Sequence, residues 1–259
     1  MLRYMYMNYY NNNKRKYNNF KNVIFKKYMC VYENPKKKRK LNIDQINNNI
    51  TNICTEFKGK IIKINAFFSY DNKTTNIINN NLIGNILENI FFSRIKEKID
   101  NFTEGPKQNS PDYYINNDYE YEQKVYIHKP NFDIGNYESY INQLANKDGV
   151  YRKLYKTKYL VFEYDIIDDY ILIKDFKILN VWDIVGYDGK YPITIQNKRG
   201  TWYNIRSSSN NDWDNNDKTP EKFIKNIILS IKECPNNISN KDYLINSIIN
   251  QYDLIKFKL

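Results

Sequence analysis

The chain has 259 residues, and its 40 Lys and Arg against 29 Asp and Glu give a net charge of +11. This basic balance indicates an acidic partner, with nucleic acid as the first choice and an anionic membrane surface as the competing one. The sequence has no apolar run of the roughly 18 residues that a spanning helix needs. It also has no phosphate-cradling glycine loop, which disfavours nucleotide-driven chemistry.

The cysteine and histidine content excludes several kinds of site. Cys30, Cys54 and Cys234 lie far apart and show no C-x-x-C spacing, so we expect neither a disulfide framework nor a zinc site. The first residues lack the apolar block and cleavage site of a signal peptide, and we expect a reducing, cytoplasmic location. The lone His128 rules out histidine metal clusters.

Residues 1–40 are rich in Met, Tyr, Asn and Lys and end in the basic run 36–40. This composition favours a poorly ordered, solvated segment over a phosphate-contacting arm. The remainder, residues 41–259, is expected to form a single domain.

Two helices and a strand are expected before residue 100. Apolar residues recur every three or four positions over 41–57, which predicts a helix, and residues 61–70 have the composition of a short strand. Residues 80–99 carry a wider apolar stripe and predict a second helix. Glu88 lies beside that stripe, at a position where burial alone does not favour a carboxylate.

Residues 110–127 predict a β-hairpin, because two Tyr-, Ile- and Val-rich runs flank the turn-forming cluster 116–118. Folding about Asn117 places Asp112 opposite Glu122, and Lys124 shares a strand face with Glu122. Facing carboxylates repel one another, and a divalent cation is the usual reason for such a pair. Hard oxygen ligands suit Mg²⁺.

After the hairpin, periodicity predicts a helix over 133–147 that Gly149 terminates, and then strands over 159–166 and 170–178. A crossover helix makes the strand that follows it parallel to the strand of Glu122. The expected fold is therefore α/β, with a central mixed β-sheet flanked by helices. Two closing helices are expected within 219–256, and their exposed apolar residues are candidates for a dimer surface.

Residues 191–206 form the best candidate for DNA contact. Two short strands surround Lys198, Arg199 and Gly200, in a segment that mixes basic, amide and aromatic side chains. Such side chains read base edges and hold phosphates. The alternative is that Trp202 and Tyr203 belong to the core and that the basic residues are merely solvated. The predicted contact residues are Gln196, Asn197, Lys198, Arg199, Asn204 and Arg206.

Pro111-Asp112, nine intervening residues and Glu122-Gln123-Lys124 resemble the PD-(D/E)xK signature, the active site of most type II restriction endonucleases. The order helix, Asp strand, Glu-x-Lys strand, helix, strand also matches that core, and the resemblance covers residues from about 80 to 235. The run 179–206 resembles the group related to GG-any-any-CC cutters. Gln123 is a departure, because this position is usually apolar; if it faces the core it needs hydrogen-bond partners.

The resemblance implies Mg²⁺-dependent, sequence-specific hydrolysis of phosphodiester bonds in double-stranded DNA. Asp112 and Glu122 would hold the metal, Lys124 would position or activate the attacking water, and Glu88 would complete the metal shell. It also implies a homodimer and a methyltransferase partner in the host.

Three alternatives are weaker or remain open. Gln196-Asn197-Lys198, with Asp183 or Asp188 upstream, imitates a Gln-x-Lys form of the motif, but the order of elements fits less well and Gln is a poorer metal ligand. A structure-selective or repair nuclease with the same core would cleave without sequence preference. In a non-catalytic basic DNA-binding protein the acidic cluster would be inert.

Overall fold

The computed structural model describes residues 42–63, 67–70, 73–76, 80–106, 110–168, 170–187, 189–210 and 212–256. The basic segment 1–40, Cys30 and Asp188 lie outside these residues. Cys54 and Cys234 are both free and buried. Among the described residues, we find no helix with the length and apolar character needed to cross a membrane.

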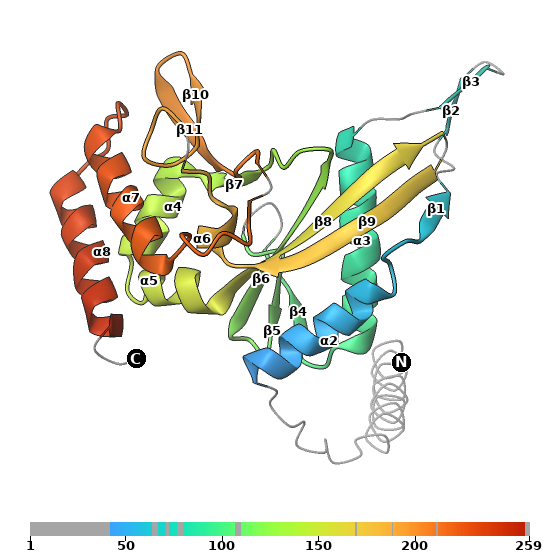
Figure 1. The fold of residues 1–259 in the computed structure, drawn as a ribbon, viewed down its shortest axis with the longest axis horizontal. Helices are drawn as coiled ribbons and strands as arrows, with labels where there is room; N and C mark the ends of the chain where they lie inside the picture. Colours follow the sequence, from blue (N-terminus) through green and yellow to red (C-terminus); the bar gives the residue numbers. More distant parts are fainter. Residues whose placement is uncertain are drawn as a thin grey trace, which may run out of the picture. The chain divides into compact units, whose positions relative to one another are not determined.

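A six-stranded sheet in the order β1-β9-β8-β6-β5-β4 organises the described part of the chain (Figure 1). β6 and β8 run parallel, and every other neighbouring pair in this sheet is antiparallel. The sheet is therefore mixed, and the predicted parallel pairing across the crossover is confirmed. Its strands are β1 (Ile61–Lys63), β4 (Phe102–Glu104), β5 (Tyr113–Ile115), β6 (Tyr119–Ile127), β8 (Thr157–Ile167) and β9 (Tyr170–Leu179).

One face of this sheet packs against two helices, α2 (Ile43–Thr55) and α3 (Asn80–Lys98). Side chains alternate along a strand, so Leu160 and Phe162 of β8 enter this core. Phe91 of α3 stacks on Phe162 with ring centroids 3.6 Å apart. Both predicted helices are confirmed, and Asn42 and Gln45 form a capping box that starts α2.

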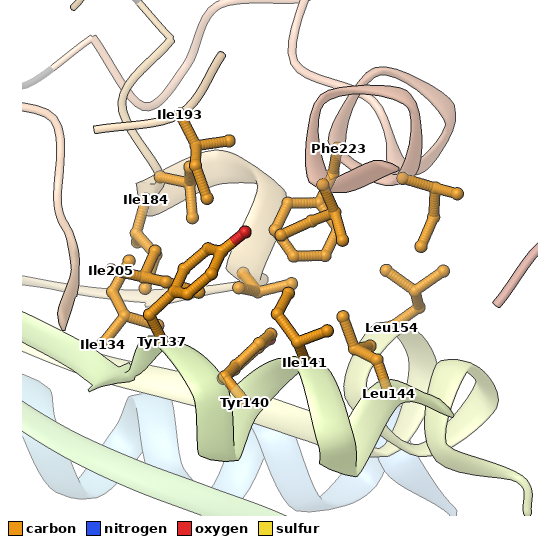
Figure 2. Close-up of a cluster of buried hydrophobic side chains, with 14 of the residues drawn as sticks. Ile134, Tyr137, Tyr140, Ile141, Leu144, Leu154, Ile184, Ile193, Ile205 and Phe223 are labelled. Carbon is orange, nitrogen blue, oxygen red and sulfur yellow. The ribbon is translucent and has the colours of Figure 1, made fainter. Parts of the chain in front are cut away.

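The opposite face packs against the helices that follow β6. Tyr159 and Val161 of β8 belong to this second core. Figure 2 shows Tyr137, Ile141 and Leu144 of one helix lying beside Phe223 of another in the same cluster. The helical segments on this side are α4 (Tyr137–Ala145), α5 (Gly149–Tyr151), the π-helical turn η1 (Arg152–Lys156), α6 (Val181–Ile184), α7 (Pro220–Glu233) and α8 (Lys241–Lys256).

Two predicted elements are corrected by the structure. Residues 61–70 do not form one strand: β1 joins the main sheet, whereas β2 (Phe67–Tyr70) pairs with β3 (Lys73–Asn76). The helix predicted over 133–147 is instead the strand β7 (Asp133–Asn136) followed by α4. The side chain of Asn136 accepts a hydrogen bond from the Ser139 amide and so starts α4 after the strand. Gly149 begins α5 instead of ending α4.

A small sheet in the order β10-β11-β7 contains the predicted DNA-contacting segment. The predicted hairpin is confirmed as β10 (Ile195–Lys198) and β11 (Thr201–Arg206). Arg199 and Gly200 connect the strands with φ of 54° and 82°, the left-handed pair typical of a two-residue hairpin turn. β11 also pairs with β7, a connection that the sequence did not reveal.

Candidate active site

The β5–β6 hairpin has the predicted register. Tyr113 pairs with Tyr121 and Ile115 with Tyr119, and Asp112 directly precedes this ladder, beside Glu122. Asn116 and Asn117 make the turn with φ of 57° and 56°, which Asn tolerates better than most residues. Turn chemistry thus sets which residues face one another, and it brings the two acids together.

Asp112 is held by several backbone contacts. Its amide donates to the Tyr121 carbonyl at 3.1 Å, and its Oδ2 accepts a hydrogen bond from the Gln123 amide at 2.6 Å. The amide of Gly105 donates to the Asp112 carbonyl at 2.8 Å. A Cβ at Gly105 would lie 1.8 Å from the Pro111 carbonyl oxygen, so this close approach requires glycine. The Asp112 carboxylate is therefore fixed against β6.

A cavity of about 610 Å³ opens where β6 extends beyond its short partner β5. The four residues predicted for catalysis, Glu88, Asp112, Glu122 and Lys124, all line it. Glu122 and Lys124 come from β6, and Glu88 comes from α3 on the far side of the sheet. Since the cavity lies beside the end of β5, side chains from both faces reach it.

Glu122 is almost fully buried, with 3% of its surface exposed. Its Oε2 lies 3.5 Å from Nζ of Lys124, whereas its buried Oε1 accepts no hydrogen bond from any described residue. Burial raises the pKa of Glu122; the charge of Lys124 opposes this, and that of Asp112 adds to it. For Lys124, burial alone lowers the pKa, but the carboxylates of Glu122, Asp112 and Glu88 outweigh it and raise the pKa above its ordinary value.

Glu88 and Gln123 link the helix α3 to the strand β6. Burial raises the pKa of Glu88 to about 7, with Lys124 lowering it and Asp112 and Glu122 raising it further. Gln123 is 2% exposed, and its Nε2 donates to the Glu88 carbonyl at 2.9 Å. Its Oε1 is buried without a partner among the described residues. The predicted hydrogen-bond partner of Gln123 is therefore found for its Nε2 but not, among the described residues, for its Oε1.

The donor chemistry of the cavity fits a small, hard cation. Asp112 and Glu122 offer carboxylate oxygens, and Glu122 Oε1 is buried without a hydrogen bond. Within the described part of the chain, no three His, Cys, Asp or Glu side chains are close enough to form a complete metal-binding group. Mg²⁺ is commonly held by only one or two carboxylates together with water and phosphate oxygens, so a pair of acids is sufficient.

The cavity also contains residues that the sequence did not single out. Lys153 of η1, Tyr140 and Gln143 of α4 and Asp133 of β7 all line it. Lys153 was missed because residues 149–156 looked like a plain connection between a helix and a strand. Asp133 was missed because it was assigned to the end of a helix.

Part of the predicted DNA-contacting set is engaged in an internal network. Nδ2 of Asn204 donates to Asp133 Oδ2 at 2.9 Å and to Gln196 Oε1 at 3.1 Å. Nη1 of Arg206 lies 2.9 Å from Asp133 Oδ1, and its Nη2 contacts Asn131. These side chains tie β10 and β11 to β7 next to the cavity.

The rest of that set lies at the hairpin turn. Asn197 accepts a hydrogen bond from the Gly200 amide at 3.1 Å and donates one to the Tyr191 hydroxyl at 2.9 Å. Lys198 and Arg199 are exposed, and Lys198 Nζ lies 5.5 Å from the centre of the Tyr203 ring. Lys198 and Arg199 are therefore the two basic residues of this set with charges turned to solvent.

Asp183, one candidate acid of the competing cluster around Gln196 and Lys198, is engaged in local hydrogen bonds. Asp183 is the third residue of α6 and accepts hydrogen bonds from the Asn180 amide at 2.8 Å and from Asn180 Nδ2 at 2.9 Å. Its carboxylate therefore has a structural role at the start of that helix. Asp188 lies outside the described residues.

Comparisons with known proteins agree with this architecture. A family model described as NgoBV restriction endonuclease matches residues 47–256. Among solved structures, NlaIV restriction endonuclease superposes with a TM-score of 0.66 at 21% sequence identity, covering 84% of this chain and 90% of that one. No curated protein sequence matches the chain. The structural likeness shows a shared fold, and the family match spans most of the chain.

Proposed function

The chain belongs to the NgoBV restriction endonuclease family and is a type II restriction endonuclease, a site-specific deoxyribonuclease, and we propose that it cuts DNA in the cavity around Asp112, Glu122 and Lys124. One observation carries this proposal. The hairpin brings two carboxylates and a lysine to one cavity, where one of the carboxylate oxygens is buried without a hydrogen bond from the described residues. Such an oxygen is costly to bury unless a cation completes its coordination.

Restriction endonucleases typically need a divalent metal ion, and we propose Mg²⁺ held directly by Asp112 and Glu122, with Glu88 in the outer shell. When bound, Mg²⁺ stabilises the charge that develops on the scissile phosphate and lowers the pKa of a bound water. Asp112 is already fixed by its hydrogen bond from the Gln123 amide and needs little reorganisation to serve as a ligand. Lys124 contributes ammonium donors that orient the attacking water next to the phosphate.

For DNA contact, the observed hydrogen bonds divide the predicted residues into two roles. We propose that Lys198 and Arg199, exposed at the β10–β11 turn, contact DNA directly. Gln196, Asn204 and Arg206 shape the surface beside the cavity through Asp133. Asn197 stabilises the turn that presents the two basic side chains.

Three further proposals concern the setting of the enzyme. A homodimer suits a palindromic target, since two-fold protein symmetry then mirrors that of the site. A methyltransferase of the host would methylate the same sequence and so protect it from cleavage. Both enzymes would act on DNA in the cytoplasm. Sedimentation of the purified protein with and without DNA tests the first of these.

Cleavage of a long, fully sequenced, unmethylated DNA with Mg²⁺ tests the site. Discrete fragments are expected from the wild type and none from Asp112→Asn, which keeps an oxygen for the Gln123 amide while removing the charge. Asp118→Asn is the matched control, because Asp118 is in the same hairpin but pairs with Lys156 outside the cavity. Full cleavage by Asp112→Asn would refute the assignment of the site, and a smear from the wild type would contradict sequence-specific cutting.

A further inference from the structure

A second lysine, Lys153, lines the same cavity as Glu122 and Lys124. It belongs to the π-helical turn η1, only 6% of its surface is exposed, and its Nζ lies 5.4 Å from the centre of the Tyr140 ring. Lysine is rarely buried unless an anion balances its charge. Lys153 therefore requires an anionic partner.

The carboxylates nearest to this part of η1 are already engaged. Glu120 accepts hydrogen bonds from Arg152 and, at 2.7 Å, from the Thr157 hydroxyl, while Asp118 pairs with Lys156 at 2.7 Å. Arg152 and Lys156 are the other basic residues of this turn. Lys153 forms no ion pair with any described acid, although Glu120 and Glu122 lie near enough to oppose the lowering of its pKa by burial.

The π-helical geometry explains this separation of the three basic side chains. The Thr157 amide donates to the Arg152 carbonyl, an i to i+5 bond that widens the turn. The turn directs Arg152 and Lys156 to their acids and leaves Lys153 at the cavity wall. Such turns are frequent at functional sites.

The charge of the cavity indicates which anion Lys153 meets. Among the described residues, five acids line it, Glu88, Glu104, Asp112, Glu122 and Asp133, against two basic residues, Lys124 and Lys153. A phosphodiester entering this wall would be repelled by the acids unless cations offset them. Lys124 lies beside Glu122, so Lys153 is the lining cation without a carboxylate at ion-pair distance among the described residues.

We propose that Lys153 binds the scissile phosphate of the DNA, whereas Lys124 orients the attacking water. This assignment rests on the proposed function of the cavity. Lys153 would donate charge-assisted hydrogen bonds to a non-bridging phosphate oxygen, and the phosphate would supply the anion that its buried ammonium lacks. These bonds strengthen as charge grows on the phosphate in the transition state, so their loss reduces the cleavage rate as well as binding.

A double-mutant cycle between protein and DNA tests the contact. Once the cut is mapped, the wild type and Lys153→Met are titrated, without divalent metal, with a duplex of that site and with the same duplex carrying a neutral methylphosphonate at the scissile position. The acids repel the phosphate in the absence of metal, so the two proteins are compared by how much the neutral linkage changes their affinity. That change is expected to be about 10-fold less favourable for the wild type, which loses the Lys153 contact, than for Lys153→Met. Equal changes in the two proteins, or coupling only at a flanking phosphate, would overturn the proposal.

Two accompanying measurements separate this contact from a structural role. Single-turnover cleavage should fall about 10- to 100-fold in Lys153→Met and recover in part in Lys153→Arg. The unfolding temperature of Lys153→Met should equal or exceed that of the wild type, since a buried unpaired cation is removed. A clear fall in the unfolding temperature together with additive binding losses would show that Lys153 serves only to balance Glu120 and Glu122.

The matched control is Lys158→Met. Lys158 is also a partly buried lysine whose pKa is lowered by burial, but it donates to Asn180 and lies outside the cavity. Its methylphosphonate response should match the wild type. If the wild type shows no cleavage that depends on Asp112, the proposed function itself fails; cleavage without coupling at Lys153 rejects this inference alone.

Discussion

Glu88→Gln should stabilise the metal-free protein at alkaline pH and leave it unchanged at acidic pH. Burial raises the pKa of Glu88 from its ordinary value near 4.5 to about 7. The folded protein therefore holds a proton at Glu88 between these values that the unfolded chain has lost, so this group reduces stability as the pH rises through that window. Gln resembles the protonated form and does not titrate.

The size of the effect follows from the pKa difference. A rise in the pKa from 4.5 to about 7 corresponds to about 3 kcal/mol of lost stability for a group that is fully buried away from solvent. Glu88 is only partly buried, so solvent reduces this to about 1–2 kcal/mol. Glu88→Gln is therefore expected to match the wild type near pH 4.5 and to exceed its free energy of unfolding by about 1–2 kcal/mol at pH 8.

Urea unfolding in EDTA at both pH values measures this difference. Glu97→Gln is the control, because Glu97 is on the same helix but is exposed and paired with Arg94. Added Mg²⁺ should stabilise the wild type more than Glu88→Gln, since a ligand that binds the folded state raises its stability. A difference between Glu88→Gln and the wild type that does not change with pH would refute the reasoning.

The remaining predictions concern Gln123 and two arginines. Gln123→Leu restores the apolar residue usual at this position and removes an amide whose oxygen has no partner among the described residues. The free energy of unfolding, measured by chemical denaturation, should therefore change by less than about 1 kcal/mol. A loss of more than about 3 kcal/mol would contradict this account. Arg206→Met should lower the free energy of unfolding by about 1–3 kcal/mol, because Asp133 loses a charged partner; unchanged stability would argue against the network. Arg199→Ala should leave the unfolding temperature unchanged and reduce the salt dependence of DNA binding by about one phosphate contact; an unaltered salt slope would exclude Arg199 from the interface.

The hairpin of the site could be derived from the sequence because local chemistry determines it. Two Asn residues in left-handed conformations set the turn, and a period of two along each strand then placed Asp112, Glu122 and Lys124 together. The helix α3 was equally clear from its apolar stripe. In each case the information lies within about 20 neighbouring residues.

The parts that were missed depend on contacts between distant segments. Ile134 fits the helical period of α4, and only pairing with β11, about 70 positions later, makes residues 133–136 a strand. Lys153 enters the cavity because η1 is π-helical, which no periodicity predicts. The role of Asp133 as the acceptor for Asn204 and Arg206 likewise appears only once the small sheet has formed.

The strand β7 connects the cavity, where cleavage is proposed, with the β10–β11 hairpin, which is proposed to contact DNA. Its four residues, 133–136, line the cavity, and three of them pair with β11 of the hairpin that presents Arg199. Backbone ladders and the Asp133 contacts with Asn204 and Arg206 join these parts, so the hairpin is tied directly to the cavity wall. If the hairpin contacts DNA as proposed, this connection fixes the distance along the DNA between the bases that the hairpin contacts and the phosphate in the cavity. That coupling gives a physical reason for an enzyme of this family to cut at one position relative to the sequence it recognises.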